Sequence, residues 1–265
     1  MDDPLAGVDA LTVPGPARHP LARAAWALLL VLATAPAVRA EFADFSAYGR
    51  LLQRHVSPGE THGIRLHRVD YRAWAADPDH ARAVASLAAF DPARLATRAE
   101  RLAFWINAYN LLAVKTVIDT GVTGSIKDAG GLFRPVWERD AGVAGGRGVS
   151  LDQVEHKVLR PMGEPRIHLA IVCASLSCPD LRPEPYVPDT LDAQLDDAAR
   201  NFLGNPTKGL AVRGNGVTVS RIFDWFEGDF GGEAGVLRFV GGYVALPGRA
   251  RIDGYFPYDW ALNGR

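Results

Sequence analysis

The sequence predicts an α+β fold, rich in helix, in which a small sheet surrounds one buried central helix. Three observations predict this class: apolar residues at helical spacing over residues 97–119, a continuous apolar run at residues 166–173, and alternating residues around a glycine turn at residues 210–219. The 265 residues, 48% of them hydrophobic, suffice to build the core of one domain. No repeat or break in composition divides them. Residues 41–265 are therefore predicted to form a single globular domain.

The first 40 residues are predicted to be a signal peptide. Residues 24–38 form an apolar run of about 15 residues, shorter than the ~20 that a membrane-spanning helix needs. Arg23 lies just before this run, and Val38 and Ala40 after it are the small residues that a signal peptidase requires for cleavage after Ala40. We therefore expect a periplasmic or secreted protein that carries no membrane span after cleavage.

Composition narrows the classes of partner. The formal net charge is −1, from 29 basic and 30 acidic residues, which gives no sign of a surface for nucleic acid or anionic lipid. The sequence contains no phosphate loop, dinucleotide glycine fingerprint, nucleophile elbow or zinc-protease motif. We therefore predict no nucleic-acid partner and no cofactor, and expect the partner to be a small molecule or a peptide.

Four segments in the first part of the chain have the pattern of helices. Residues 42–55 and 80–90 are amphipathic, and residues 97–119 form the strongest pattern because apolar side chains recur every three or four residues. Residues 150–159 begin with a capping box, a serine followed three residues later by a glutamine. Between these helices we expect a loop at residues 57–63, an extended stretch at residues 64–71 and a long, glycine-rich irregular segment at residues 121–148.

The second part of the chain combines extended segments with helices. The apolar run at residues 166–173 is typical of a strand buried on both faces. Such a strand would pack against the helix at residues 97–119, which we expect to be largely buried. The other predicted elements are a helix at residues 189–203, a β-hairpin at residues 210–219, short helices at residues 224–230 and 233–239, and an extended, aromatic-rich tail at residues 250–260.

The densest cluster of reactive side chains surrounds the end of the predicted strand. It contains His168, Cys173, Ser175 and Cys178, and active sites of α/β proteins often lie at such a strand end. In an exported protein the two cysteines either form a disulfide or leave Cys178 as a thiol nucleophile, and the sequence is compatible with both. Their spacing does not match a zinc hook, so no metal site is predicted.

Spacing restricts which histidine can act on Cys178. In a regular strand, His168 and Cys173 would point to opposite faces and lie about 16 Å apart, at ~3.3 Å per residue. We therefore expect the base to be His156, which lies in the preceding helix beside Glu155. The alternative base is His168, if the loop that carries Cys178 folds back along the strand.

Two amides lie on the predicted central helix. Asn107 and Asn110 are three residues apart and therefore share one face of it, among apolar residues. Buried amides need hydrogen-bond partners. We expect them either to orient a catalytic imidazole or to cap the loop that contains Gly130 and Gly131.

Four ordered blocks of the sequence have the pattern of a known family. They are FWINAYNLLAVKTV (104–117), SLDQVEHKVLR (150–160), RIHLAIVCASLSCPDLR (166–182) and YFPYDWALN (255–263). Together they resemble the domain-of-unknown-function family numbered 547, over about residues 60–263. A central helix packed on a strand is also loosely similar to the transglutaminase-like and papain-like thiol enzymes, although no cysteine lies on this central helix. The resemblance implies no particular activity, because this family has no settled biochemical function. The residues that fall in its characteristic motifs are Asn107, Asn110, His156, His168, Ser175, Cys178 and Pro179.

Two hypotheses of function follow. The first is an exported thiol-dependent hydrolase or acyltransferase, with Cys178 as nucleophile and His156 or His168 as base. The second is a non-catalytic binding or scaffold domain, in which a disulfide between Cys173 and Cys178 fixes the loop. Under the first hypothesis, His156, Cys178 and at least one of the two asparagines should line one cavity, with His168 at the opposite end of its strand from Cys173.

Overall fold

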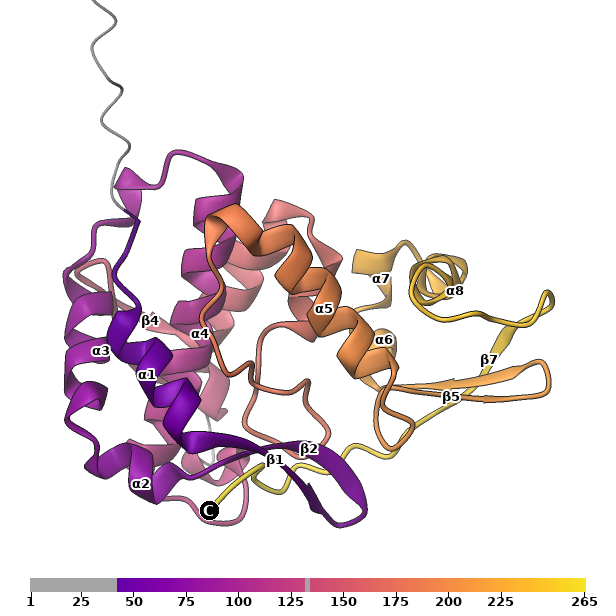
Figure 1. Ribbon diagram of the computed structural model, residues 1–265, viewed down its shortest axis with the longest axis horizontal. Coiled ribbons are helices and arrows are strands. Elements are labelled where there is room, and N and C mark those ends of the chain that lie inside the picture. The colour runs from indigo at the N-terminus through magenta and orange to yellow at the C-terminus, as the bar shows by residue number, and fades with distance from the viewer. Residues whose placement is uncertain (1–41, 132–133) are drawn as a thin grey trace, which may run out of the picture. The chain divides into compact units, whose positions relative to one another are not determined.

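A computed structural model describes residues 42–131 and 134–265 of the chain (Figure 1). The predicted signal peptide, residues 1–40, lies outside the described residues. The described residues form a helix-rich α+β structure with small sheets, which confirms the predicted class, and they belong to one compact unit. Among them, no helix combines the length and the apolar character that crossing a membrane requires.

Helices and paired strands of the described residues are interspersed along the chain. The α-helices are α1 (Ser46–His55), α2 (Tyr71–Ala76), α3 (Pro78–Ala89), α4 (Arg98–Thr120), α5 (Leu191–Leu203), α6 (Ile222–Trp225), α7 (Glu227–Phe230) and α8 (Glu233–Gly241). The strands are β1 (Val56–Thr61), β2 (Ile64–Val69), β3 (Asp140–Ala144), β4 (Arg147–Ser150), β5 (Leu210–Arg213), β6 (Gly216–Val219) and β7 (Arg251–Tyr255). The described residues also contain a π-helix, η4 (Gln153–Leu159). The short 3-10 helices are η1 (Pro92–Arg94), η2 (Ile126–Ala129), η3 (Val136–Glu138), η5 (Arg160–Met162), η6 (Pro165–Leu169) and η7 (Pro188–Thr190).

Helix α4 is the buried centre of the larger of two hydrophobic cores. Its first turn is closed by a capping box, in which the side chain of Thr97 accepts from the N–H of Glu100 and the Glu100 carboxylate accepts from the N–H of Thr97. Gly121 ends the helix with φ 63°, in the left-handed region. The fully buried apolar side chains of α4 include Leu102, Phe104, Ile106, Leu111 and Leu112. The prediction of a largely buried helix at residues 97–119 is therefore confirmed.

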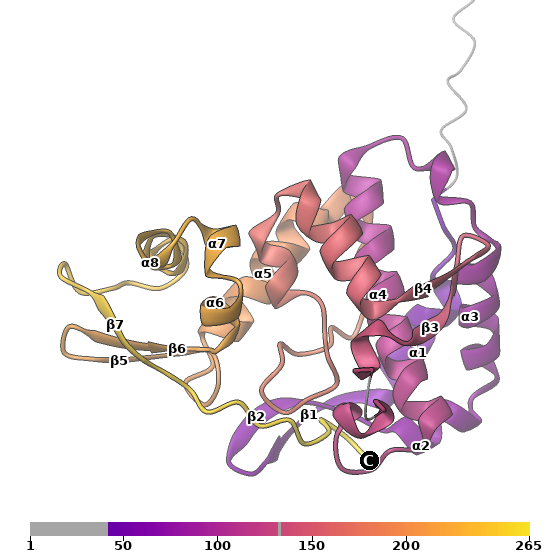
Figure 2. The same cartoon turned by 180° about the vertical axis from the view of Figure 1, so that it is seen from behind.

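Two hairpins occupy segments that we expected to be loops. Residues 57–63 were predicted to be a loop, but most of them form β1, which pairs antiparallel with β2. Residues 121–148 were predicted to be irregular, but their second half forms the β3–β4 hairpin, which turns at Gly145 and Gly146 with φ 62° and 73°. Glycines in left-handed turns are what a tight hairpin requires, so a high glycine content does not by itself indicate irregular structure. Figure 2 shows this hairpin beside α3 and α4.

A third sheet and the last helices form the smaller core. The predicted hairpin is confirmed as β5 and β6, and the aromatic-rich tail adds β7 parallel to β6. The predicted short helices are present as α6 to α8. The smaller core contains Phe202 of α5, Val217 and Val219 of β6, Phe223 of α6 and Val236 of α8.

The apolar run at residues 166–173 is not a strand, so this prediction is wrong. Its first half lies in the 3-10 helix η6, and the residues from 170 to 178 then follow an irregular path. Ile167 and Ile171 pack in the larger core, whereas Leu169 packs in the smaller one. The run is mostly apolar because its residues pack into both cores, and a helical turn buried on all sides gives the same pattern as a buried strand.

The side-chain amides of Asn107 and Asn110 form hydrogen bonds with buried backbone groups. In a sheet, a neighbouring strand would form such bonds. The Asn110 amide donates to the carbonyl of Ala170 at 3.0 Å and accepts from the N–H of Val172 at 2.8 Å. The Asn107 amide pairs in the same way with the carbonyl and N–H of Tyr186, at 2.7 Å and 2.9 Å. Both amides therefore bond backbone, and not the imidazole or the glycine loop that we expected as alternatives.

We predict that Asn110→Ala lowers the free energy of unfolding by roughly 2–6 kcal/mol. The substitution leaves one buried carbonyl and one buried N–H without a partner, at a cost of about 1–3 kcal/mol each. Chemical denaturation measures this difference. Asn201→Ala is the matched control because Asn201 is an exposed amide on α5, and we expect its effect to stay within about 0.5 kcal/mol. An equal, small effect of both substitutions would contradict the role assigned to Asn110.

Candidate functional site

A cavity of about 190 Å³ lies where the larger core meets the smaller one. Its lining comes from α4, η4, η6 and the residues after it, α6 and the C-terminal segment. This volume is below the ≈ 300 Å³ at which sites for drug-sized ligands begin, so it suits a single side chain or a very small molecule. Much of the lining is aromatic: Tyr109, Trp137, Trp225, Phe226, Tyr258 and Trp260.

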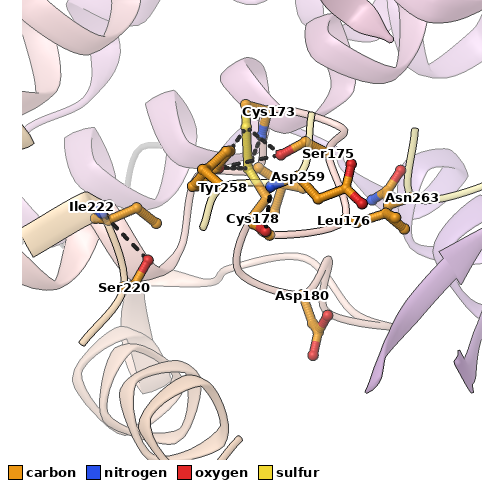
Figure 3. Close-up of a disulfide and its surroundings, with 12 residues drawn as sticks. Cys173, Ser175, Leu176, Cys178, Asp180, Ser220, Ile222, Tyr258, Asp259 and Asn263 are labelled. Atoms are coloured by element: carbon orange, nitrogen blue, oxygen red, sulfur yellow. Dashed lines mark hydrogen bonds between the residues drawn. A yellow bond between two sulfur atoms is a disulfide. The ribbon is translucent and has the colours of Figure 1, made fainter. Parts of the chain in front are cut away.

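Cys173 and Cys178 form a disulfide in the wall of this cavity (Figure 3). Cys178 Sγ accepts hydrogen bonds from the N–H of Cys173 at 2.9 Å and from the hydroxyl of Tyr258 at 3.3 Å. The Ser175 hydroxyl donates to the Tyr258 oxygen at 3.2 Å and also lies 3.2 Å from Cys173 Sγ. Of the two states that the sequence left open, the structure therefore contains the disulfide, enclosed by polar groups.

The loop between the cysteines is held by the C-terminal segment. Ala174 has φ 60°, a left-handed conformation that is uncommon outside glycine, and it reverses the chain directly after Cys173. The N–H of Leu176 donates to the carbonyl of Ala261, and the N–H of Asn263 donates to the carbonyl of Ala174. These bonds give the buried loop the backbone partners that the missing strand ladder would have supplied.

Lys208 anchors the same loop. Its side chain is 1% exposed, and Nζ donates to the Cys178 carbonyl and to Asp180 Oδ1, both at 2.7 Å, and to the Leu176 carbonyl at 3.5 Å. Burial lowers the pKa of Lys208, while the Asp180 carboxylate acts in the opposite direction. A buried ammonium needs this set of acceptors, so Lys208 fixes the position of Cys178 through its backbone.

His168 lies in the cavity lining with a fixed tautomer. Its side chain is 1% exposed, its ring stacks on Phe226 at 4.0 Å, and Nε2 lies 2.8 Å from Asp229 Oδ2. Arg160 donates two hydrogen bonds to Asp229 and is the main cause that lowers the pKa of this carboxyl to about 2. Burial lowers the pKa of His168 to about 4. The imidazole is therefore neutral at pH 7, with its proton on Nε2 and a lone pair on Nδ1.

Glu155 faces His168 across a gap. Its side chain is 13% exposed, Oε2 accepts from the Tyr109 hydroxyl at 3.3 Å, and Oε1 lies 4.0 Å from His168 Nδ1. Burial raises the pKa of Glu155 to about 7, although the Tyr109 hydroxyl and the Arg160 charge oppose this shift. Glu155 is therefore a carboxyl group that changes its charge near neutral pH, inside a cleft, which is a property typical of functional sites.

His156 also lines the cavity, but Glu155 is not its hydrogen-bonded partner. Its Nδ1 accepts from Arg160 at 2.9 Å, and its Nε2 lies 3.7 Å from Asp152 Oδ1. Adjacent residues on a helix point in different directions, so sequence adjacency to Glu155 did not predict a pair. Burial lowers the pKa of His156. Within the described residues, no three His, Cys, Asp or Glu side chains converge as a metal site requires.

The cavity brings together most of the predicted site residues. His156, His168, Glu155 and both cysteines line it, whereas Ser175 contacts it through Tyr258. Asn107 and Asn110 are not among its lining residues and act on the backbone behind it. His168 and Cys173 do not lie at the two ends of a strand as we expected, because η6 and an irregular segment replace that strand, and both residues line the cavity.

Sequence reasoning missed four residues that shape the site. Arg160 and Tyr258 lie in two of the blocks that resemble the family, so a signal was present, but neither was selected. Asp229 and Lys208 lie outside those blocks and carry no local pattern. Their roles depend on contacts over many residues of sequence separation, which spacing does not reveal.

Part of the chain that carries this site matches a known family. Residues 92–203 match the family described as Protein of unknown function, DUF547. The DUF547 segment runs from η1 to the end of α5 and contains the first three sequence blocks, both cysteines and both site histidines. The fourth block, with Tyr258, and Asp229 follow it in sequence. No curated protein and no solved structure matches the chain.

We predict that Glu155→Gln makes stability less sensitive to pH between about 4.5 and 7. In this range the folded protein keeps the Glu155 proton and the unfolded chain loses it, so the wild type loses stability as pH rises through this range. The full difference is about 3 kcal/mol. Chemical denaturation of both proteins from pH 4 to pH 8 measures this difference in the free energy of unfolding. The stability of the variant relative to the wild type should increase as the pH rises.

A second variant makes this test specific. Tyr109→Phe removes a hydrogen bond that lowers the pKa of Glu155, so the wild-type trend should extend to higher pH. Parallel stability curves for the wild type and Glu155→Gln over the whole range would show that the carboxyl pKa is not raised.

Proposed function

We propose that this protein is an exported, non-catalytic binding domain whose cavity receives a small molecule or one side chain of a peptide. The disulfide carries this proposal. Cys173 and Cys178, the candidate nucleophiles, are bonded to each other in the cavity wall, so neither sulfur is a thiolate in this state. A cavity without a nucleophilic sulfur, enclosed by fixed aromatic rings, supports binding better than covalent catalysis.

The lining has the composition of a binding site. Ligand sites are concave and mostly apolar, with a few polar groups that fix orientation. Here Trp225 is 45% exposed and stacks on Trp260 at 5.7 Å, and Tyr258 packs against both rings. The polar groups are concentrated at one side, on η4 and η6, which carry Glu155 and His168.

The disulfide also supports export. Disulfides persist in oxidising compartments such as the periplasm or the extracellular space and are rare in the cytosol. The predicted signal peptide at residues 1–40 would deliver the chain to such a compartment. Both arguments favour a periplasmic or secreted location.

We predict that the protein purified from its export compartment contains no free thiol. Alkylation under denaturing conditions, followed by mass spectrometry, should label neither cysteine before reduction and both after it. The buffer must contain an excess of alkylating reagent from lysis onward, so that oxidation during purification is excluded. Quantitative labelling before reduction would remove the basis of the binding-domain proposal.

A thiol-dependent hydrolase or acyltransferase is the second candidate, and one observation favours it. Cys178 Sγ accepts two hydrogen bonds, from Cys173 N–H and from the Tyr258 hydroxyl. Such donors stabilise a thiolate much more than a disulfide sulfur, because bonds to ionised acceptors are the stronger ones. After a dithiol reductant has opened the disulfide, the imidazole of His156 or His168 would take the proton of the Cys178 thiol as its sulfur attacks the carbonyl carbon of an acyl substrate. The same imidazole would then pass that proton to the leaving group.

We predict that Tyr258→Phe raises the pKa of the Cys178 thiol in the reduced protein by on the order of one unit, because it removes one donor. Cys173→Ser in the background isolates Cys178, and the pH dependence of its alkylation rate gives the pKa. Tyr243→Phe is the matched control, since its hydroxyl donates to Asp196, away from the cysteines. If Tyr258→Phe and its control behave alike, the second candidate loses its support.

A further inference from the structure

His168 presents a buried acceptor without a partner. Its Nε2 proton is donated to Asp229, and Nδ1 has no hydrogen-bond partner among the described residues, although the side chain is 1% exposed. An unpartnered acceptor in an interior costs stability, so most such atoms are satisfied by protein, water or ligand. Because His168 lines the cavity, a bound group that donates a proton to Nδ1 would supply the missing bond.

Glu155 offers a second acceptor at a suitable distance. Its Oε1 lies 4.0 Å from His168 Nδ1, which is too long for a direct hydrogen bond. One nitrogen placed about 2.8 Å from both atoms would meet them at an angle of roughly 90°, which two N–H bonds of a single ammonium group accept. The two acceptors are therefore spaced as a binding site for one multivalent donor.

The charge of the lining favours a cation. Asp152 and Glu155 are the acidic groups of the cavity, and no Lys or Arg is among the lining residues that the structure describes. Arg160, which lies nearby, donates two hydrogen bonds to Asp229, and its charge acts on Glu155 without contacting it directly. On the aromatic side, the Lys127 ammonium already lies 4.7 Å from the Trp260 ring, so a ligand would meet this indole with its aliphatic part and not with its charge.

We propose that the cavity binds a primary ammonium group on an aliphatic arm, as in a lysine side chain. The ammonium donates to Glu155 and to His168 Nδ1, and the methylene groups lie against Trp225 and Trp260. This inference rests on the proposed binding function and names its ligand class. The volume of about 190 Å³ fits one such arm.

Ligand binding should depend on pH through Glu155. An ammonium favours the carboxylate, whose pKa is about 7 in the empty site, so binding below pH 7 must release a proton. The groups that face this carboxyl are Tyr109 from α4, Asp152 and His156 from the turns around it, Arg160, His168 from η6 and Asp229 from α7. Asp229 keeps its charge above about pH 2 and His168 stays neutral above about pH 4. Affinity should therefore fall about tenfold between pH 8 and pH 6.

Three related probes test the chemistry on the full, disulfide-bonded protein at pH 8. Nα-acetyl-lysine amide carries the ammonium, Nα-acetyl-norleucine amide lacks it, and the Nα-acetyl amide of trimethyllysine keeps the charge but has no N–H on it. Tryptophan fluorescence and titration calorimetry report binding. We expect saturable binding of the lysine probe, and at least tenfold weaker binding of the other two.

Variants locate the interaction. Glu155→Gln keeps the shape of the side chain, and we expect at least tenfold weaker lysine-probe binding at pH 8 and no pH dependence between pH 6 and pH 8. Asn201→Ala, on the exposed side of α5, should bind as the wild type does. Retained secondary structure and an intact disulfide, checked by circular dichroism and thiol counting, confirm that a loss of binding is local.

The outcomes separate this inference from the proposed function. Equal binding of all three probes would overturn the ammonium assignment but leave a binding domain, and so would failure of the lysine probe to saturate while the disulfide is intact. Equal binding of the lysine and trimethyllysine probes alone would assign recognition to the aromatic rings and not to His168 and Glu155. Free thiols in the exported protein would instead contradict the proposed function itself.

Discussion

The structure depends on one constraint. A buried segment that forms neither a strand nor a long helix needs hydrogen-bond partners for its N–H and carbonyl groups. Residues 170–178 are buried except for Cys173, which is partly exposed, so most of their N–H and carbonyl groups need partners within the protein. The partners come from side chains and from distant backbone: Asn110 bonds the start of the segment, Lys208 bonds its end, and the C-terminal residues bond its middle. A buried polar group without such a partner would cost more than most single contacts contribute.

This solution also creates the site. A strand would have separated His168 from the cysteines, whereas an irregular path lets the chain reverse at Ala174 and close the disulfide. The residues that bond this irregular segment also line the site. The C-terminal segment, for example, bonds the Ala174 carbonyl through the N–H of Asn263 and places the Tyr258 hydroxyl on Cys178 Sγ. Stability and site geometry therefore rest on the same hydrogen bonds.

The sequence predicted elements well where local physics decides them. Helix α4 follows from apolar spacing, a capping box and a terminal glycine, and the β5–β6 hairpin follows from its turn. Burial of residues 166–173 was also predicted, but their conformation was not. An apolar run indicates that a segment is buried, but it does not distinguish a buried strand from a buried helical turn. The cavity likewise joined predicted residues such as His156 and Cys178, while Asp229 was missed because only the folded chain brings it to His168.

Two carboxyl groups near His168 have different charges near neutral pH because their environments differ. Asp229 is bound by Arg160 through two hydrogen bonds, which keeps it ionised and fixes the imidazole tautomer. Glu155 is buried and accepts only one weak hydrogen bond, from Tyr109, so burial is the main influence on its charge and raises its pKa to about 7. Environments that separate two similar groups in this way assign them different roles. Asp229 positions His168, and Glu155 is the group through which the cavity responds to a ligand or to pH.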